Sequence, residues 1–169
     1  GGTLQLGNGG TAGNIATTTA IHDDGTLAVD RSDAITVGQV IDGTGNLTQI
    51  GTGTTTLTGT DTYTGATTID NGTLALSGTG SIAQSTGVQD NAAFDISGVT
   101  TGSSSIQSLN GAGTVALGGN TLDITNGNAT FGNTFSGVAS GSGGLTVSGG
   151  TETLSGANTY TGVTTVASG

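Results

Sequence analysis

Gly72-Thr73-Leu74-Ala75-Leu76 is the stretch that decides the fold, because its pattern returns along the whole chain. Aliphatic residues alternate with small or polar ones after a glycine, which is typical of a short, half-buried β-strand. No window of the sequence shows helical periodicity. The sequence therefore predicts an all-β protein. Close copies of the stretch lie at residues 2–6, 25–29 and 113–117, with looser copies at 120–124 and 144–147.

The spacing of these strands predicts how they assemble. Large apolar residues recur at intervals of roughly twenty residues, the length of one coil in a solenoid of short strands. In such a stack each strand pairs with the coils above and below, and inward side chains form ladders. We therefore predict a right-handed parallel β-helix over residues 1–169, uncapped at both ends, the right hand being the default for parallel crossovers. The recurring positions are Leu27, Leu47, Leu74, Phe94 and Val115.

Composition limits how such a fold can be stabilised. The chain has 35 glycines and no cysteine, proline, methionine or tryptophan, so disulfides and thiolate metal sites are excluded. Its glycine content also permits disorder. A mean hydropathy of +0.06 and the ordering of apolar residues into short runs argue for a folded chain instead. Aliphatic ladders must supply most of the core, because the aromatic residues are only Phe94, Phe131, Phe135, Tyr63 and Tyr160.

The charge balance excludes several classes of partner. Eleven acidic residues stand against a single basic residue, Arg31, and the net charge is −10. Nothing is available to neutralise phosphates, so nucleic acids and anionic lipid surfaces are not expected partners. No apolar run approaches the ~20 residues of a membrane span. The absence of an initiator methionine and of a leader indicates an internal piece of a longer protein.

A longer repeat is superimposed on the short one. Residues 59–69, the first Tyr-Thr-Gly segment, return as residues 156–166, the second Tyr-Thr-Gly segment. The order Ser-Gly-x-Asn-x-Tyr-Thr-Gly-x-Thr-Thr followed by Gly-Thr-Leu-x-Leu resembles the passenger-associated repeat of autotransporter proteins. We place repeat copies near residues 45–76 and 142–169 of a single β-helix segment. Residues 135–145 resemble the stretch that commonly precedes this repeat.

The resemblance implies a function as well as a fold. It implies a right-handed parallel β-helix that is extracellular or on a bacterial cell surface, exported with the help of a C-terminal membrane barrel. A non-enzymatic structural or adhesive stalk is then expected, whose partners are host-cell, matrix or neighbouring bacterial-surface components. The second copy ends before its Gly-Thr-Leu strand, while residues 2–6 supply such a strand at the other end. End-to-end self-association or a longer tandem array is therefore expected.

Side chains capable of chemistry are few and scattered. His22 is the only histidine and precedes Asp23 and Asp24, a pattern that we interpret as a solvated turn. The remaining candidate calcium ligands match neither known loop signature. The carboxylates lie mostly at turn positions beside Gly or Asn, where a short acceptor side chain is expected to cap its own backbone. We expect no catalytic, cofactor-binding or metal-binding residues, and polysaccharide cleavage is the weakest alternative. These other carboxylates are Asp61, Asp70, Asp90 and Asp123.

Two further patterns leave alternatives open. Alternating threonines would direct their hydroxyls to one strand face, and a stacked array of them would suit an ice-binding β-helix; ordinary strand decoration is the simpler interpretation. Tyr63 and Tyr160 occupy equivalent repeat positions, which favours a packing role over exposed platforms for sugars. The alternating threonines are Thr54, Thr56, Thr58, Thr151 and Thr153.

Overall fold

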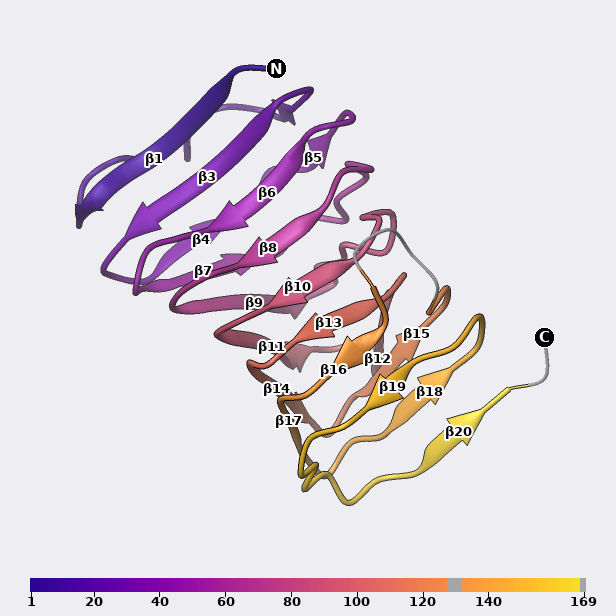
Figure 1. Cartoon of the computed structure of the whole chain (residues 1–169). Helices are drawn as coiled ribbons and strands as arrows, with labels where there is room; N and C mark the ends of the chain where they lie inside the picture. The colour runs from indigo at the N-terminus through magenta and orange to yellow at the C-terminus, as the bar shows by residue number, and fades with distance from the viewer. Residues whose placement is uncertain (128–131, 168–169) are drawn as a thin grey trace.

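The computed structural model describes residues 1–127 and 132–167, and in these every named element is a β-strand. The chain winds into stacked coils, with its termini at opposite ends of the stack (Figure 1). Strand pairing between coils is parallel throughout these ranges. The predicted parallel β-helix is thus confirmed. No helix long and apolar enough to cross a membrane is found in the described ranges.

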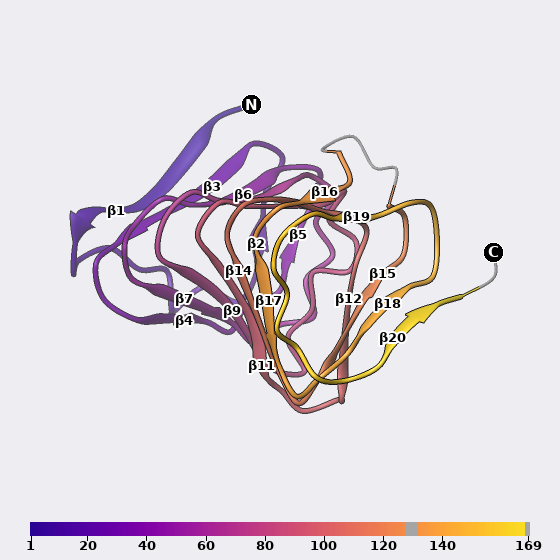
Figure 2. The ribbon, with the colours of Figure 1, turned by 60° about the horizontal axis from the view of Figure 1, so that its bottom comes forward.

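The coil has three sides, which are visible when the stack is viewed nearly end on (Figure 2). The first side is an eight-stranded sheet, the second a six-stranded sheet, and the third a two-stranded sheet followed farther along by a four-stranded one. The eight-stranded sheet contains β1 (Thr3–Gly10), β3 (Thr26–Arg31), β6 (Asn46–Gln49), β8 (Thr67–Ile69), β10 (Val88–Asp90), β13 (Leu109–Gly111), β16 (Thr134–Phe135) and β19 (Thr153–Leu154).

The other strands divide between the second and third sides. The six-stranded sheet contains β4 (Ile35–Val37), β7 (Thr54–Leu57), β9 (Thr73–Gly78), β11 (Ala93–Val99), β14 (Thr114–Gly118) and β17 (Val138–Gly141). The third side contains β2 (Ile21–His22) and β5 (Ile41–Asp42), then β12 (Ser103–Ile106), β15 (Thr121–Ile124), β18 (Leu145–Val147) and β20 (Thr164–Val166). A full coil therefore contributes one short segment to each side.

The recurring large residues form two ladders instead of one. Leu27 stacks on Leu47 in the eight-stranded sheet, whereas Leu74, Phe94 and Val115 stack in the six-stranded sheet. The longer step between Leu47 and Leu74 is the step from one side of the coil to another. Our prediction of the coil length was right. The Gly-Thr-Leu strand, however, is found on all three sides of the coil and does not mark one of them.

One inward column of the eight-stranded sheet mixes apolar and polar residues. It passes through Val29, Gln49, Ile69 and Asp90 in successive coils. Gln49 is 1% exposed but fully occupied: Nε2 donates to the Gly51 carbonyl at 2.8 Å, and Oε1 accepts from the Thr55 hydroxyl at 2.6 Å. A polar group in the core is thus tolerated where it is hydrogen-bonded on all sides. Phe131 lies outside the described residues.

Candidate functional site

The two Tyr-Thr-Gly segments repeat the same backbone contacts with the coil beneath. In the first, the amides of Thr62 and Tyr63 donate to the Ile41 carbonyl at 2.8 and 3.2 Å. In the second, the amides of Thr159 and Tyr160 donate to the Ala139 carbonyl at 2.8 and 3.2 Å. The next threonine of each segment donates to the carbonyl of a glycine with positive φ, Gly43 (104°) or Gly141 (123°). The segment is therefore a defined structural unit.

The two units nevertheless lie on different sides of the coil. The first runs between β7 and β8 and rests on β5, on the third side. The second runs between β19 and β20 and rests on β17, a strand of the six-stranded sheet. The local sequence therefore determines the shape of the segment, whichever side of the coil the segment occupies.

Each tyrosine is fixed by a hydrogen bond to the threonine four residues later. Tyr63 Oη lies 2.6 Å from Thr67 Oγ1, and Tyr160 Oη lies 2.7 Å from Thr164 Oγ1. Thr67 Oγ1 lies a further 2.9 Å from Ser85 Oγ in the next coil. Tyr63 is 1% exposed, and its burial raises the pKa of the phenol. Tyr160 is half-buried. The packing role predicted for the pair is confirmed for Tyr63.

Removal of this hydroxyl should be measurable. We expect Tyr63→Phe to lower the free energy of unfolding by about 1–2 kcal/mol, because a buried hydrogen bond is lost. Urea denaturation followed by far-ultraviolet circular dichroism would measure the change. Tyr160→Phe is the matched control, and we expect it to change stability by less than about 0.5 kcal/mol because that site is partly solvated. Equal effects at the two sites would contradict the assignment of Tyr63 as the structural member.

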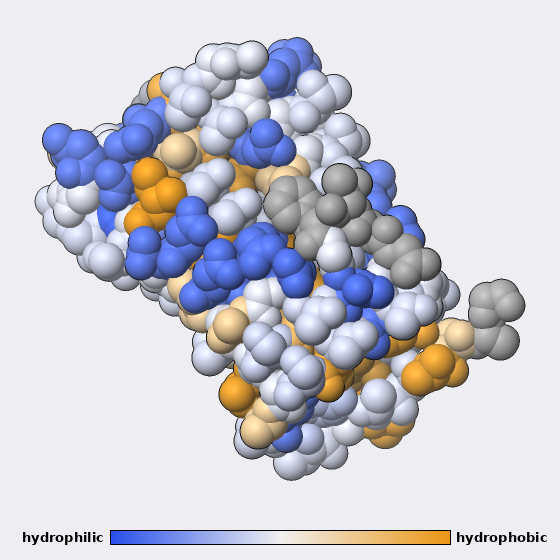
Figure 3. All heavy atoms as spheres, viewed as in Figure 1, coloured by the Kyte–Doolittle hydropathy of each residue, from blue (hydrophilic) through white to orange (hydrophobic). Residues whose placement is uncertain are grey.

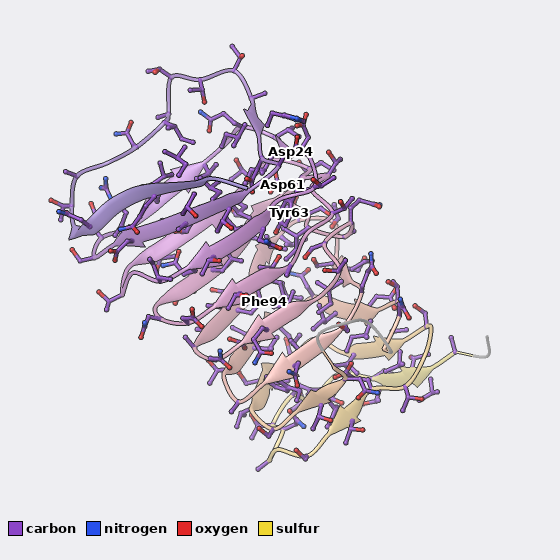
Figure 4. The ribbon with its side chains drawn as sticks, turned by 45° about the horizontal axis from the view of Figure 1, so that its top comes forward. Asp24, Asp61, Tyr63 and Phe94 are labelled. Atoms are coloured by element: carbon purple, nitrogen blue, oxygen red, sulfur yellow. The ribbon has the colours of Figure 1, made fainter. Side chains whose placement is uncertain are left out.

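Asp61 departs from the self-capping turn that the sequence predicts. It is 2% exposed. Its Oδ1 accepts from the Ile41 amide of the previous coil at 2.9 Å, so it links two coils and does not cap its own turn. Its Oδ2 is buried with no hydrogen-bond partner. Burial raises the pKa of this carboxyl to about 7. Figure 4 shows Asp61 and Tyr63 on the same segment of the coil.

Two more carboxyls are wholly or partly buried, Asp90 fully and Glu152 in part. Asp90 Oδ1 accepts from the Ala92 amide at 3.2 Å, which confirms the predicted cap, but the residue is 0% exposed and Oδ2 has no partner. Glu152 Oε2 accepts from the Leu109 amide at 3.5 Å, and its other oxygen also has no partner. Burial raises the pKa of each to about 7. Sequence reasoning did not single out Glu152, which lies immediately before β19, two residues before Leu154.

His22, Asp24 and Asp42 form a separate surface cluster near the start of the chain, and Arg31 with Asp33 forms an ion pair apart from it. His22 is exposed, its Nδ1 bonds to Asp42, and its Nε2 lies 3.1 Å from Asp24 Oδ2. The hydrogen bond to Asp42, followed by the charge of Asp24, raises the pKa of His22. Arg31 is 6% exposed and makes two 2.8 Å bonds to Asp33. Among the described residues, no three or more His, Cys, Asp or Glu side chains are placed so that they could hold a metal ion together.

The threonines do not form a continuous array. Thr54 and Thr56 are half-buried on the outward face of β7, as their alternation predicts. The column through Thr56 begins at Thr36 but continues to Ala75 and then to Asp95. Alanine and aspartate therefore interrupt the hydroxyl rows within a few coils. Figure 3 shows the side of the eight-stranded sheet, where pale and hydrophilic residues surround apolar ones in small separate patches.

Comparison with known families agrees with these geometric repeats. The model of the passenger-associated-transport-repeat matches residues 47–76 and 149–169, and each match includes a whole Tyr-Thr-Gly segment. No curated protein and no solved structure matches the chain. The repeat family implies a secreted or surface-exposed protein. The chain is therefore a parallel β-helix that contains two stretches similar to the passenger-associated-transport-repeat.

Proposed function

We propose that the chain is a non-enzymatic structural and adhesive segment of an autotransporter passenger, displayed outside the cell. The observation that supports this proposal is the regular stack of coils. Eight parallel strands follow one another along one side, and at ~4.8 Å per strand they advance by about 34 Å. Each added coil lengthens the stack by the same step, which suits a spacer between a cell and its surroundings.

The charge of the flank supports a particular class of partner. The chain carries a net charge of −10, and its single basic side chain, Arg31, is held in an ion pair with Asp33. The surface field is therefore negative, which favours host-cell or matrix components with basic surfaces and disfavours nucleic acids. Contacts of this kind are weakened by salt, because exposed charges are screened beyond ~8–10 Å.

Binding of the purified chain to immobilised matrix proteins and to host-cell monolayers tests the adhesive role. We expect saturable attachment that declines as salt rises from 0.05 to 0.5 M, a range across which screening becomes strong. Asp70→Asn is a suitable comparison, because it makes an exposed site less negative while leaving the Tyr-Thr-Gly segments unaltered, and it should weaken attachment. Attachment to none of these surfaces would contradict the adhesive part of the proposal. Turnover of any member of a polysaccharide panel would contradict the non-enzymatic part.

A further inference from the structure

We infer that Asp61 carries a proton in the folded β-helix and donates it to the backbone carbonyl of Gly59. The carboxylic acid then forms a pH-sensitive link between neighbouring coils, and this link breaks when the proton is lost. The inference does not depend on the adhesive function, since it concerns the stability of the coil stack. It rests on the surroundings of the side chain and on a comparison within the chain.

The surroundings of Asp61 favour the neutral acid. One oxygen is paired with the Ile41 amide, and the other is buried without a donor. No cation compensates a charge there, because Arg31 is bonded to Asp33 and the His22 ring is bonded to Asp24 and Asp42. A buried carboxylate with one hydrogen bond and no counterion is costly, whereas the protonated acid can use its second oxygen as a donor.

The second repeat shows which acceptor that donor would use. Asn158 occupies the position of Asp61, and its Oδ1 accepts from the Ala139 amide at 2.8 Å just as Asp61 Oδ1 accepts from Ile41. The Asn158 amide nitrogen donates to the Gly156 carbonyl at 3.2 Å. Gly59 is the counterpart of Gly156. The Gly59 carbonyl also accepts from the Ser81 amide at 3.0 Å, so the proton of a neutral Asp61 would share this acceptor. An ionised Asp61 would keep only the bond from the Ile41 amide.

Few other ionisable groups face this position. Tyr63 lies on the same segment. Burial is the main cause of its raised pKa, and the negative charges that Asp61 and Asp23 carry when ionised add smaller contributions. Asp42 lies on the coil beneath and is engaged with His22. Residues 79–86, the coil above, contain no ionisable side chain. Hydrogen bonds to Ser81 and Ile41 hold the Asp61 segment between these two coils. The ionisable groups named above place no unpaired positive charge beside Asp61.

The direction of the pH effect follows from the raised affinity for the proton. The pKa of Asp61 is about 7 in the folded chain against 3.8 for an ordinary aspartate. The folded state therefore binds more protons than the unfolded state between these values, and stability falls as pH rises from about 4 to about 7. Above pH 7 the loss is complete. Asp90 and Glu152 act in the same direction.

Asp61→Asn is the direct test, because it installs the side chain of the second repeat. We expect the unfolding equilibrium constant of the unaltered chain to rise by at least about tenfold from pH 4.5 to pH 8, one unit of pKa difference being worth tenfold. Asp61→Asn should reduce this rise by about tenfold and should be the more stable protein at pH 8. Asp70→Asn, at an exposed site, removes the same formal charge and should leave the pH dependence almost unchanged.

Two outcomes would overturn the inference. The first is an equal pH dependence in Asp61→Asn and in the unaltered chain. The second is a direct titration: in a carbon-13 carboxyl NMR experiment on the unaltered chain, a midpoint for Asp61 below pH 5 would show that it is ionised at neutral pH. We expect that midpoint to lie within about one unit of pH 7. The NMR measurement stays decisive even if the variant does not fold.

Discussion

Replacing Gly65 with alanine is expected to lower the free energy of unfolding by about 3 kcal/mol or more, the upper range for overfilling a packed site. Gly65 is the glycine of the first Tyr-Thr-Gly segment. A Cβ atom there would lie 2.0 Å from the Gly45 carbonyl oxygen of the previous coil. That oxygen belongs to the backbone and cannot move without opening the stack. Chemical denaturation followed by circular dichroism would measure the loss, together with the amount of folded protein recovered.

Gly38→Ala provides the matched control for this prediction. Its added Cβ atom would have only the Thr58 hydroxyl nearby, at 3.5 Å, which is an ordinary contact. We expect a change within about 0.5 kcal/mol, as for surface substitutions in general. If Gly65→Ala were as stable as Gly38→Ala, the coils at this point could not be as closely stacked as the structure shows. Gly162 should behave like Gly65, since its Cβ atom would lie 2.3 Å from the Gly143 carbonyl oxygen.

Truncation of Phe94 should have an effect of similar size for the opposite reason. Phe94 is 0% exposed and stacks between Leu74 and Val115 in the six-stranded sheet. Figure 4 places it within the stack of coils. Phe94→Ala leaves a cavity and forfeits apolar burial, at an expected cost of about 3–5 kcal/mol. Thermal and urea unfolding would both show the loss, and the site should also become more accessible to amide hydrogen exchange.

The position of Phe94 in the stack gives this prediction a second readout. In a solenoid each coil contacts only its neighbours, so a weakened coil separates the two sides of the stack. We expect Phe94→Ala to unfold with a broader transition, and the exchange of β9 and β14 to increase most. Val163→Ala, at a side chain that is 75% exposed, should leave both readouts unchanged. Uniform acceleration of exchange along the chain would contradict a nearest-neighbour stack.

The sequence was sufficient for the architecture because strand and turn signals are local. Alternation in residues 72–76 and its recurrence predicted parallel strands and the coil length. Which side of the coil a strand joins was not predictable from the same signal. Leu47 and Leu74 have equivalent patterns, yet they belong to different sheets. The side depends on how many residues the intervening turns use, and a short strand pattern carries no information about that.

The buried carboxyls were not predicted for a different physical reason. An aspartate beside glycine or threonine has the composition of an ordinary capped turn, as Asp90 partly confirms. The burial of Asp61 is completed by the coil above it, through the hydrogen bond of its amide to Ser81. A contact with a residue that distant in the sequence leaves no local trace. The available signal was the exchange of Asp61 for Asn158 between the two repeats, which points to a site suited to a neutral side chain.

The placement of the two Tyr-Thr-Gly segments on different sides also has an evolutionary consequence. Recombination between the two copies would join positions 61 and 158 at a seam that is locally intact, because both copies make the same contacts with the coil below. Gene duplication or excision at this seam can therefore change the reach of the protein without rebuilding its interior. It would also rotate every downstream outward residue by one side about the long axis. Length and facing direction are therefore linked, so a version of the chain with a different number of copies would present different residues along a given side of the stack.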